Sequence, residues 1–177
     1  MLRAPLKEDK GTLVNTDLCF FANRELSTDI SKHKIVIEDL YTCKIHPDLV
    51  PYIQLPVVYL KNYNSYTYDY EKNSFAWAYD DLIANEWSNN MIHVDCDSRR
   101  NGIIMGLVLS IHLAKKLITL NKDFVVMMLY GSYRKDSVKV SFYMPREGFP
   151  GLFDLKTINE KGTGRLLLIT NEGNESF

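Results

Sequence analysis

The chain has 177 residues, of which 46% are hydrophobic and 24% are charged, and its formal net charge is −1. A chain of this length is typical of one domain and can bury about 70% of the surface that it exposes when unfolded. Three cysteines without paired spacing argue against a disulfide framework. The start of the chain lacks the apolar core of a signal peptide, and the longest apolar run (103–114) is too short to cross a bilayer. The sequence therefore favours a cytoplasmic protein without a membrane partner.

The first half of the chain favours β-structure. Residues 1–15 are polar and are expected to form a loosely ordered arm. The prolines of H-P-D-L-V-P (46–51) mark a turn, because proline lacks the backbone N–H that a helix or sheet requires. The run K-N-Y-N (61–64) separates two β-rich segments and predicts a hairpin. The strands predicted in this half are Asp17–Asn23, Ile35–Glu38, Leu40–Ile45, Val57–Lys61 and Ser65–Tyr70.

The second half combines one long helix with further strands. A helix is expected from Arg100 to Leu120, with Asp97 or Ser98 as its N-cap. Its middle is apolar nearly all round, so we expect it to be the central core helix, with most of Leu107, Leu109 and Ile111 buried. A shorter helix is predicted at Asp80–Trp87. The predicted strands are Met91–Cys96, Asp123–Tyr130, Val138–Tyr143, Leu152–Ile158 and Arg165–Thr170.

These elements predict an α+β fold. Turns join most of the strands, and G-S-Y-R-K-D (131–136) is a strong hairpin signal, so the sheet should be largely antiparallel and twisted. The strand at Asp123–Tyr130 is apolar on both faces and should be central. In the strand at Val138–Tyr143, Lys139 and Ser141 should face outward. We expect a single domain over 1–177, with loosely ordered ends at 1–15 and 171–177.

An aromatic and acidic segment is the main candidate site. Residues 63–81 contain seven aromatic side chains, and residues 69–97 contain seven acids and one lysine, a net charge of −6. Aromatic residues are enriched in interface hot spots, and acids around them speed the approach of a cationic partner. The alternative is a tyrosine-rich sheet face covered by the long helix, with the acids on a solvated face. The candidate partner-binding residues are Tyr63, Tyr66, Tyr68, Asp69, Tyr70, Glu71, Tyr79, Asp80, Asp81 and Glu86.

The segment H-V-D-C-D offers a second chemistry. On a strand, His93, Asp95 and Asp97 would project from one face, where an imidazole and two carboxylates could hold a divalent metal for hydrolysis. No further donors are evident nearby, so we expect no metal site. Cys96 should point away from His93, because side chains alternate along a strand, which disfavours cysteine–histidine catalysis.

Other functional classes have little support. The chain lacks G-x-x-x-x-G-K-[ST], G-x-G-x-x-G and H-E-x-x-H, so no nucleotide cofactor is expected. G-S-Y-R-K could contact a nucleic-acid backbone, and residues 101–177 carry 10 Lys/Arg against 7 Asp/Glu. The tyrosine-rich segment is acidic, however, and nucleic-acid binding needs clustered cations. We therefore expect no catalytic residue and no cofactor; the alternatives are a small metal-assisted hydrolase that uses the H-V-D-C-D segment and a nucleic-acid-binding module.

The chain is small, has an α+β pattern and lacks a catalytic motif. It also contains an acidic and aromatic segment, D-Y-E-K-N-S-F-A-W-A-Y-D-D. In these respects the chain resembles the immunity proteins of bacterial polymorphic-toxin and contact-dependent inhibition systems. The resemblance implies a non-catalytic inhibitor of one cognate toxin, commonly a basic nuclease, that covers the active site or the substrate surface. No family motif matches residue by residue, so the resemblance assigns a role to no individual residue.

Overall fold

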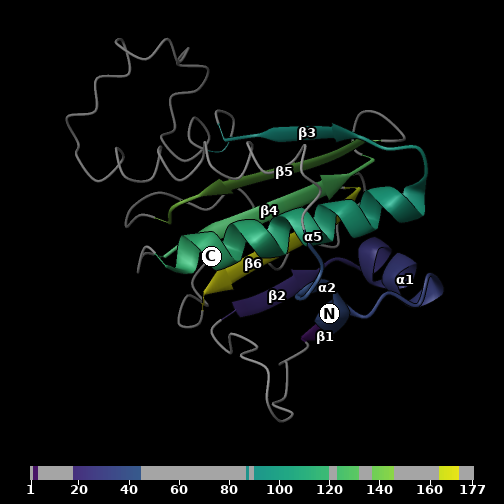
Figure 1. Ribbon diagram of the computed structural model, residues 1–177, viewed down its shortest axis with the longest axis horizontal. Helices are drawn as coiled ribbons and strands as arrows, with labels where there is room; N and C mark the ends of the chain where they lie inside the picture. Colours follow the sequence, from purple (N-terminus) through teal and green to yellow (C-terminus); the bar gives the residue numbers. More distant parts are fainter. Residues whose placement is uncertain are drawn as a thin grey trace.

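The computed structural model describes residues 2–3, 18–44, 87, 90–119, 123–131, 137–145 and 164–171. They form an antiparallel sheet of six strands, and one long helix lies along a face of that sheet (Figure 1). The elements are β1 (Leu2–Arg3), β2 (Leu18–Ala22), α1 (Arg24–Lys32), α2 (Ile37–Leu40), β3 (Ile92–Asp95), α5 (Arg99–Ile118), β4 (Val125–Tyr130), β5 (Ser137–Tyr143) and β6 (Arg165–Asn171). The strand order is β1-β2-β6-β4-β5-β3. The predicted α+β fold with an antiparallel sheet and a long core helix is confirmed.

The centre of the sheet consists of β6, β4 and β5. All six residues of β4 are buried, and β4 pairs antiparallel with both neighbours, with Met128 opposite Leu167 on one side and Val140 on the other. This agrees with the prediction of a central strand that is apolar on both faces. Gly131 follows β4, and its φ of 73° lies in the left-handed region that glycine adopts without strain.

Helix α5 begins at the predicted N-cap. The Ser98 hydroxyl accepts a hydrogen bond from the backbone N–H of Asn101, which satisfies one of the unpaired donors at the helix start. Two glycines let the helix approach the sheet closely. A Cβ added at Gly106 would lie 2.6 Å from Val138 Cγ2, and one added at Gly102 would lie 2.5 Å from Tyr130 Cε2. By length and composition α5 could cross a membrane, but 61% of that stretch is buried, as expected of a core helix.

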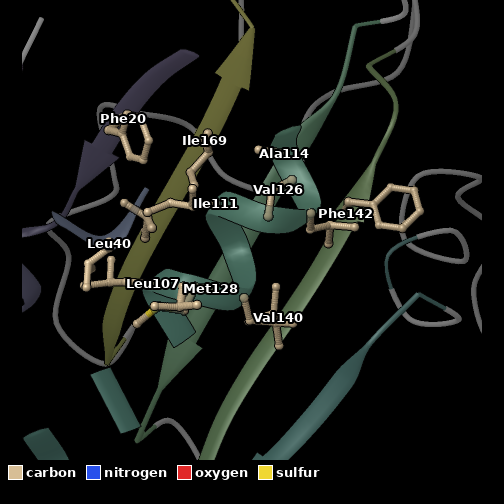
Figure 2. Close-up of a cluster of buried hydrophobic side chains, with 14 of the residues drawn as sticks. Phe20, Leu40, Leu107, Ile111, Ala114, Val126, Met128, Val140, Phe142 and Ile169 are labelled. Atoms are coloured by element: carbon tan, nitrogen blue, oxygen red, sulfur yellow. The ribbon is translucent and has the colours of Figure 1, made fainter. Parts of the chain in front are cut away.

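The main core lies between α5 and the sheet (Figure 2). Leu107, Leu109 and Ile111 are all 0% exposed, as predicted. They pack with side chains that point from alternate positions of each strand, because strand side chains alternate between the two faces. The sheet contributes Phe20, Val126, Met128, Val140, Phe142 and Ile169 to this cluster.

The opposite face of the sheet carries a second buried cluster. Trp87 and Cys19 pack against it. On this face Ser141 is buried, whereas the sequence predicted that it would face outward. Its hydroxyl donates to the backbone carbonyl of Trp87, which compensates for its burial. The buried members of this cluster are Phe21, Val125, Met127, Leu129, Tyr143, Leu166 and Leu168.

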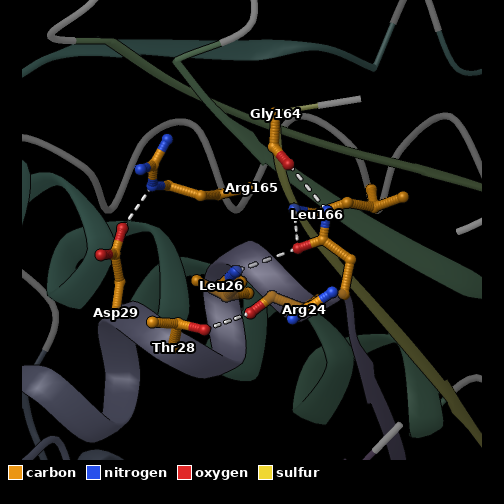
Figure 3. A network of polar contacts seen from close by, with 8 residues as sticks. Arg24, Leu26, Thr28, Asp29, Gly164, Arg165 and Leu166 are labelled. Atoms are coloured by element: carbon orange, nitrogen blue, oxygen red, sulfur yellow. Dashed lines mark hydrogen bonds and ion pairs between the residues drawn. The ribbon is translucent and has the colours of Figure 1, made fainter. Parts of the chain in front are cut away.

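Helix α1 was not predicted. Asn23, expected at the end of a strand, is instead its N-cap and is 0% exposed. Its side-chain oxygen accepts from the N–H groups of Leu26 and Leu166, both at 3.1 Å, and its amide donates to the Gly164 carbonyl at 2.7 Å. Figure 3 shows these bonds beside the ion pair between Asp29 and Arg165, which also joins α1 to β6.

The strands predicted at Ile35–Glu38 and Leu40–Ile45 are wrong. Residues 37–40 form the short helix α2, and Tyr41 and Thr42 form a turn. The β-branched run at 35–37 favours a strand locally, but here packing of this segment against α5 decides its conformation. In the predicted loose arm, Leu2–Arg3 instead forms β1, which pairs antiparallel with β2.

Several predicted elements lie outside the described residues. Trp87 is helical, which is the only described position of the helix predicted at Asp80–Trp87. The proline turn at 46–51, the hairpin of Val57–Lys61 and Ser65–Tyr70, and the strand at Leu152–Ile158 lie wholly outside them.

Candidate functional site

The aromatic and acidic segment is described only at its C-terminal end. Trp87 and residues 90–97 belong to the described part of the chain. Hydrogen bonds to β5 hold this end in place: Ser141 donates to the carbonyl of Trp87, and the Asn90 amide donates to the carbonyl of Phe142 at 3.4 Å. The predicted partner-binding residues Tyr63, Tyr66, Tyr68, Asp69, Tyr70, Glu71, Tyr79, Asp80, Asp81 and Glu86 lie outside the described residues.

Strand β3 carries the polar residues of H-V-D-C-D and is an edge strand of the described sheet. His93 and Asp95 are exposed on the face opposite α5, as alternation predicts, whereas Ile92 and Val94 pack into the main core. Asp97 is also exposed, but it lies beyond the end of the strand. Its Oδ1 accepts a hydrogen bond from Asn101 Nδ2 at 2.9 Å, so Asp97 supports the start of α5.

Two kinds of chemical site were considered around β3: a metal site and a cysteine–histidine pair. Within the described residues, no three His, Cys, Asp or Glu side chains are grouped closely enough to hold a metal ion. Cys96 is half-buried against the main core, on the side of β3 opposite His93. Its thiol therefore points away from the imidazole, and this agrees with the prediction from the strand pattern.

A cavity of about 320 Å³ lies on the same face of the sheet as α5, and the sequence did not reveal it. Its floor is formed by Phe20 and Ala22 of β2 and Leu167 of β6. Around them stand Ile30 of α1, Ile35 of the connection and Ile37 of α2, all half-buried. The remaining lining residues are Ser27, Ser31, Val36 and Glu38.

The cavity was missed because α1 was missed. Its walls are α1 and α2, and both segments were either unassigned or predicted as strands. A useful signal was present: Leu26 and Ile30 are four residues apart and follow Asn23, a good N-cap residue, with Glu25 in the first turn and Lys32 in the last. That pattern is typical of a short helix with one apolar face.

Two contacts hold α2 against α5 beside the cavity. Lys115 Nζ donates to the Tyr41 carbonyl at 2.7 Å and lies 4.7 Å from the centre of the Tyr41 ring. His112 Nε2 is 2.8 Å from the Cys43 carbonyl. The His112 side chain is half-buried. These contacts fix the position of the chain that closes one side of the cavity.

Comparison of the chain with protein-family models, with curated proteins and with solved structures finds no match. The fold and the local geometry are therefore the observations from which a function can be proposed.

Proposed function

We propose that this protein is a non-catalytic binding protein that neutralises a cognate bacterial toxin domain in the cytoplasm. The carrying observation is the exposure of Asp95 on β3 and of Asp97 just beyond this strand, both at the end of the acidic segment. The proposed partner is a basic domain, such as a nuclease, because clustered carboxylates attract a surface that itself binds polyanions.

The edge position of β3 supports the same proposal. Among the described strands, β3 is the last at its side of the sheet and pairs only with β5. An extended segment of a partner can add to such an edge through backbone hydrogen bonds. The exposed side chains of His93 and Asp95 would then contribute to selectivity, while Ile92 and Val94 stay in the core.

Hydrogen bonds also fix the described end of the acidic segment on the sheet. The hydrogen bonds from Ser141 to Trp87 and from Asn90 to Phe142 attach this end of the segment to β5. Contact residues that are held in place before binding lose less conformational entropy when a complex forms. The anchors proposed for the interface are Tyr63, Tyr66, Tyr68, Tyr70 and Tyr79, with the acids as its charged rim.

The test is a cell-protection assay combined with binding kinetics against the toxin domain encoded by the neighbouring gene. Replacing Asp80, Asp81 and Glu86 together by their amides should slow association and flatten its salt dependence, because rim charges act mainly on the on-rate. Tyr68→Ala or Tyr79→Ala should speed dissociation by about 2 kcal/mol if the ring is a central hot spot.

The control is Glu25→Gln, which removes an exposed acid on α1 that does not belong to the acidic segment. It should leave both rates unchanged. Full protection and unchanged kinetics in all of the segment variants would contradict the proposed interface. Absence of any toxin among the products of the neighbouring genes, together with catalytic turnover by the purified protein, would contradict the proposed function itself.

A further inference from the structure

We propose that the cavity between β2, α1 and α2 binds a small amphiphile with an apolar body and one cationic amine. This inference goes beyond the proposed function and does not rest on it, because none of the residues involved belongs to the acidic segment.

The size and lining of the cavity support a small ligand. Its volume of about 320 Å³ lies at the lower end of the range of roughly 300–1,000 Å³ that is typical of ligand pockets. Phe20 and Leu167 at its floor are buried and belong to the main core, so the lower part of the cavity is rigid. An aromatic ring or branched aliphatic group placed there would replace water against apolar side chains.

The hydroxyls of α1 provide hydrogen-bonding groups at one side. Ser27 and Ser31 are four residues apart and both line the cavity, so they lie one above the other on the same face of the helix. Thr28, on another face, donates to the carbonyl of Arg24 at 2.8 Å. By contrast, neither serine hydroxyl has a hydrogen-bond partner among the described residues. Both hydroxyls are therefore available to a polar group of a ligand.

The charge at the opening selects the sign of that group. Glu38 is the one charged side chain among the described lining residues, and it is exposed. Val36, beside it in the chain, is 49% exposed and is the one large hydrophobic side chain of the described residues with such exposure. An apolar surface next to a carboxylate and two hydroxyls matches a ligand in which an ammonium group is attached to an apolar body.

The experiment titrates three matched probes into the full-length protein: phenethylamine, 2-phenylethanol and 3-phenylpropionate. They share an aromatic body and differ in the charge of the polar group. Backbone amide shifts in the nuclear magnetic resonance spectrum report where each probe binds. Phenethylamine should shift amides of 20–38 in a saturable way, with a dissociation constant of about a millimolar or below, as expected for so few atoms. It should bind roughly two- to five-fold more tightly than the alcohol, because an exposed charge pair adds little, and the carboxylate should bind most weakly.

Three variants test whether the probes bind in the cavity and whether Glu38 selects the amine. Ser27→Leu fills the cavity from α1 and should weaken phenethylamine binding by about tenfold or abolish it. Thr28→Leu introduces the same side chain one residue away, off the lining, and should leave binding unchanged. Glu38→Gln should keep binding of the alcohol and remove the preference for the amine. Amide spectra of each free variant show whether it is folded.

Several results would overturn the proposal. They are the absence of saturable binding, equal effects of Ser27→Leu and Thr28→Leu, and an amine preference that survives Glu38→Gln. If no probe binds and Ser27→Leu weakens the complex with the neighbouring gene's product, the cavity receives a side chain of a protein partner and the small-ligand proposal is wrong. Failure here with intact toxin binding leaves the proposed function standing, so the two outcomes are distinguishable.

Discussion

Lys115 of α5 contacts Tyr41 at two places: its ammonium donates to the Tyr41 carbonyl and also lies over the face of the Tyr41 ring. One side chain thereby holds both the backbone and the ring at the end of α2. The Tyr41 hydroxyl is buried and has no hydrogen-bond partner among the described residues. Burial, with a smaller contribution from the charge of Glu38, raises the pKa of Tyr41 far above its ordinary value.

This arrangement predicts that Tyr41→Phe changes the response of stability to alkaline pH. Above about pH 10 the unfolded chain ionises this tyrosine whereas the folded protein keeps it neutral, so the free energy of unfolding falls by about 1.4 kcal/mol per pH unit. The variant should lack that loss and should be at least as stable as the parent near pH 8, because the removed hydroxyl is buried without a partner among the described residues.

The measurement is urea denaturation of both proteins at several values between pH 8 and 11. Burial lowers the pKa of Lys115, which makes stability rise with pH until the unfolded lysine also loses its proton. Because both proteins contain Lys115 and the other tyrosines, these contributions cancel in the difference. A difference in unfolding free energy that stays constant over this range would contradict the prediction.

The core helix predicts large costs for truncation. Leu107→Ala, Leu109→Ala and Ile111→Ala each remove a side chain that is 0% exposed and should each lower the free energy of unfolding by about 2–5 kcal/mol. Chemical denaturation measures these values, and Ile118→Ala, at a half-buried position near the end of α5, serves as the comparison with a smaller expected cost. Three costs below about 1 kcal/mol would mean that α5 is peripheral.

Gly106→Ala should destabilise the protein although alanine is the better helix former. The new methyl would lie 2.6 Å from Val138 Cγ2 and 2.7 Å from Met128 Sδ. Overpacking of a closely packed core costs about 1–3 kcal/mol, against a gain in helix propensity of about 1 kcal/mol. We expect a net loss of about 1–2 kcal/mol by thermal and chemical denaturation. Combining the change with Val138→Ala should give a smaller loss than the sum of the two single variants; a purely additive result would contradict the contact.

Lys34→Gly should stabilise the protein. Lys34 follows α1 with a φ of 53°, a left-handed conformation that costs a residue with a Cβ about 1–2 kcal/mol. The hydrogen bond from the Ile35 N–H to the Ile30 carbonyl, at 3.0 Å, keeps the chain in this turn. Glycine should recover about 1 kcal/mol of unfolding free energy, partly offset by the greater freedom of the unfolded chain. Lys32→Gly, inside the helix, should destabilise instead, and equal effects of the two changes would contradict the prediction.

The strongly patterned parts of the fold could be predicted from the sequence. The apolar run of α5 and the doubly apolar sequence of β4 predict their burial directly, and the alternating sequence of β5 predicts a strand, although burial of its second face at Ser141 was not predicted. Helix α1 could not be found as easily, because R-E-L-S-T-D-I-S-K contains two apolar residues and much of its stability comes from Asn23 and Asp29 contacts with β6. Such contacts join positions 143 and 136 residues apart, and a local pattern does not show them.

For the candidate sites too, local patterns predict some features, whereas contacts between distant segments determine others. The orientations of His93, Asp95 and Cys96 follow from simple alternation on β3. The cavity, by contrast, is made of residues from five segments, and its shape depends on the turn at Lys34 and on the packing of α2 against α5. The ten predicted partner-binding residues at 63–86 remain a prediction.

The strand order has a consequence for how the chain is made. β6 lies between β2 and β4, so the sheet has a gap at its centre until residues 165–171 have left the ribosome. Until then, Phe21 lacks its partner Leu168, and Val126 lacks Ile169. Two unpaired strand edges rich in apolar residues are prone to aggregation. Synthesis of this protein should therefore depend on a chaperone that shields nascent strands, and a nonsense mutation just before Gly164 should yield insoluble product rather than a shorter folded form.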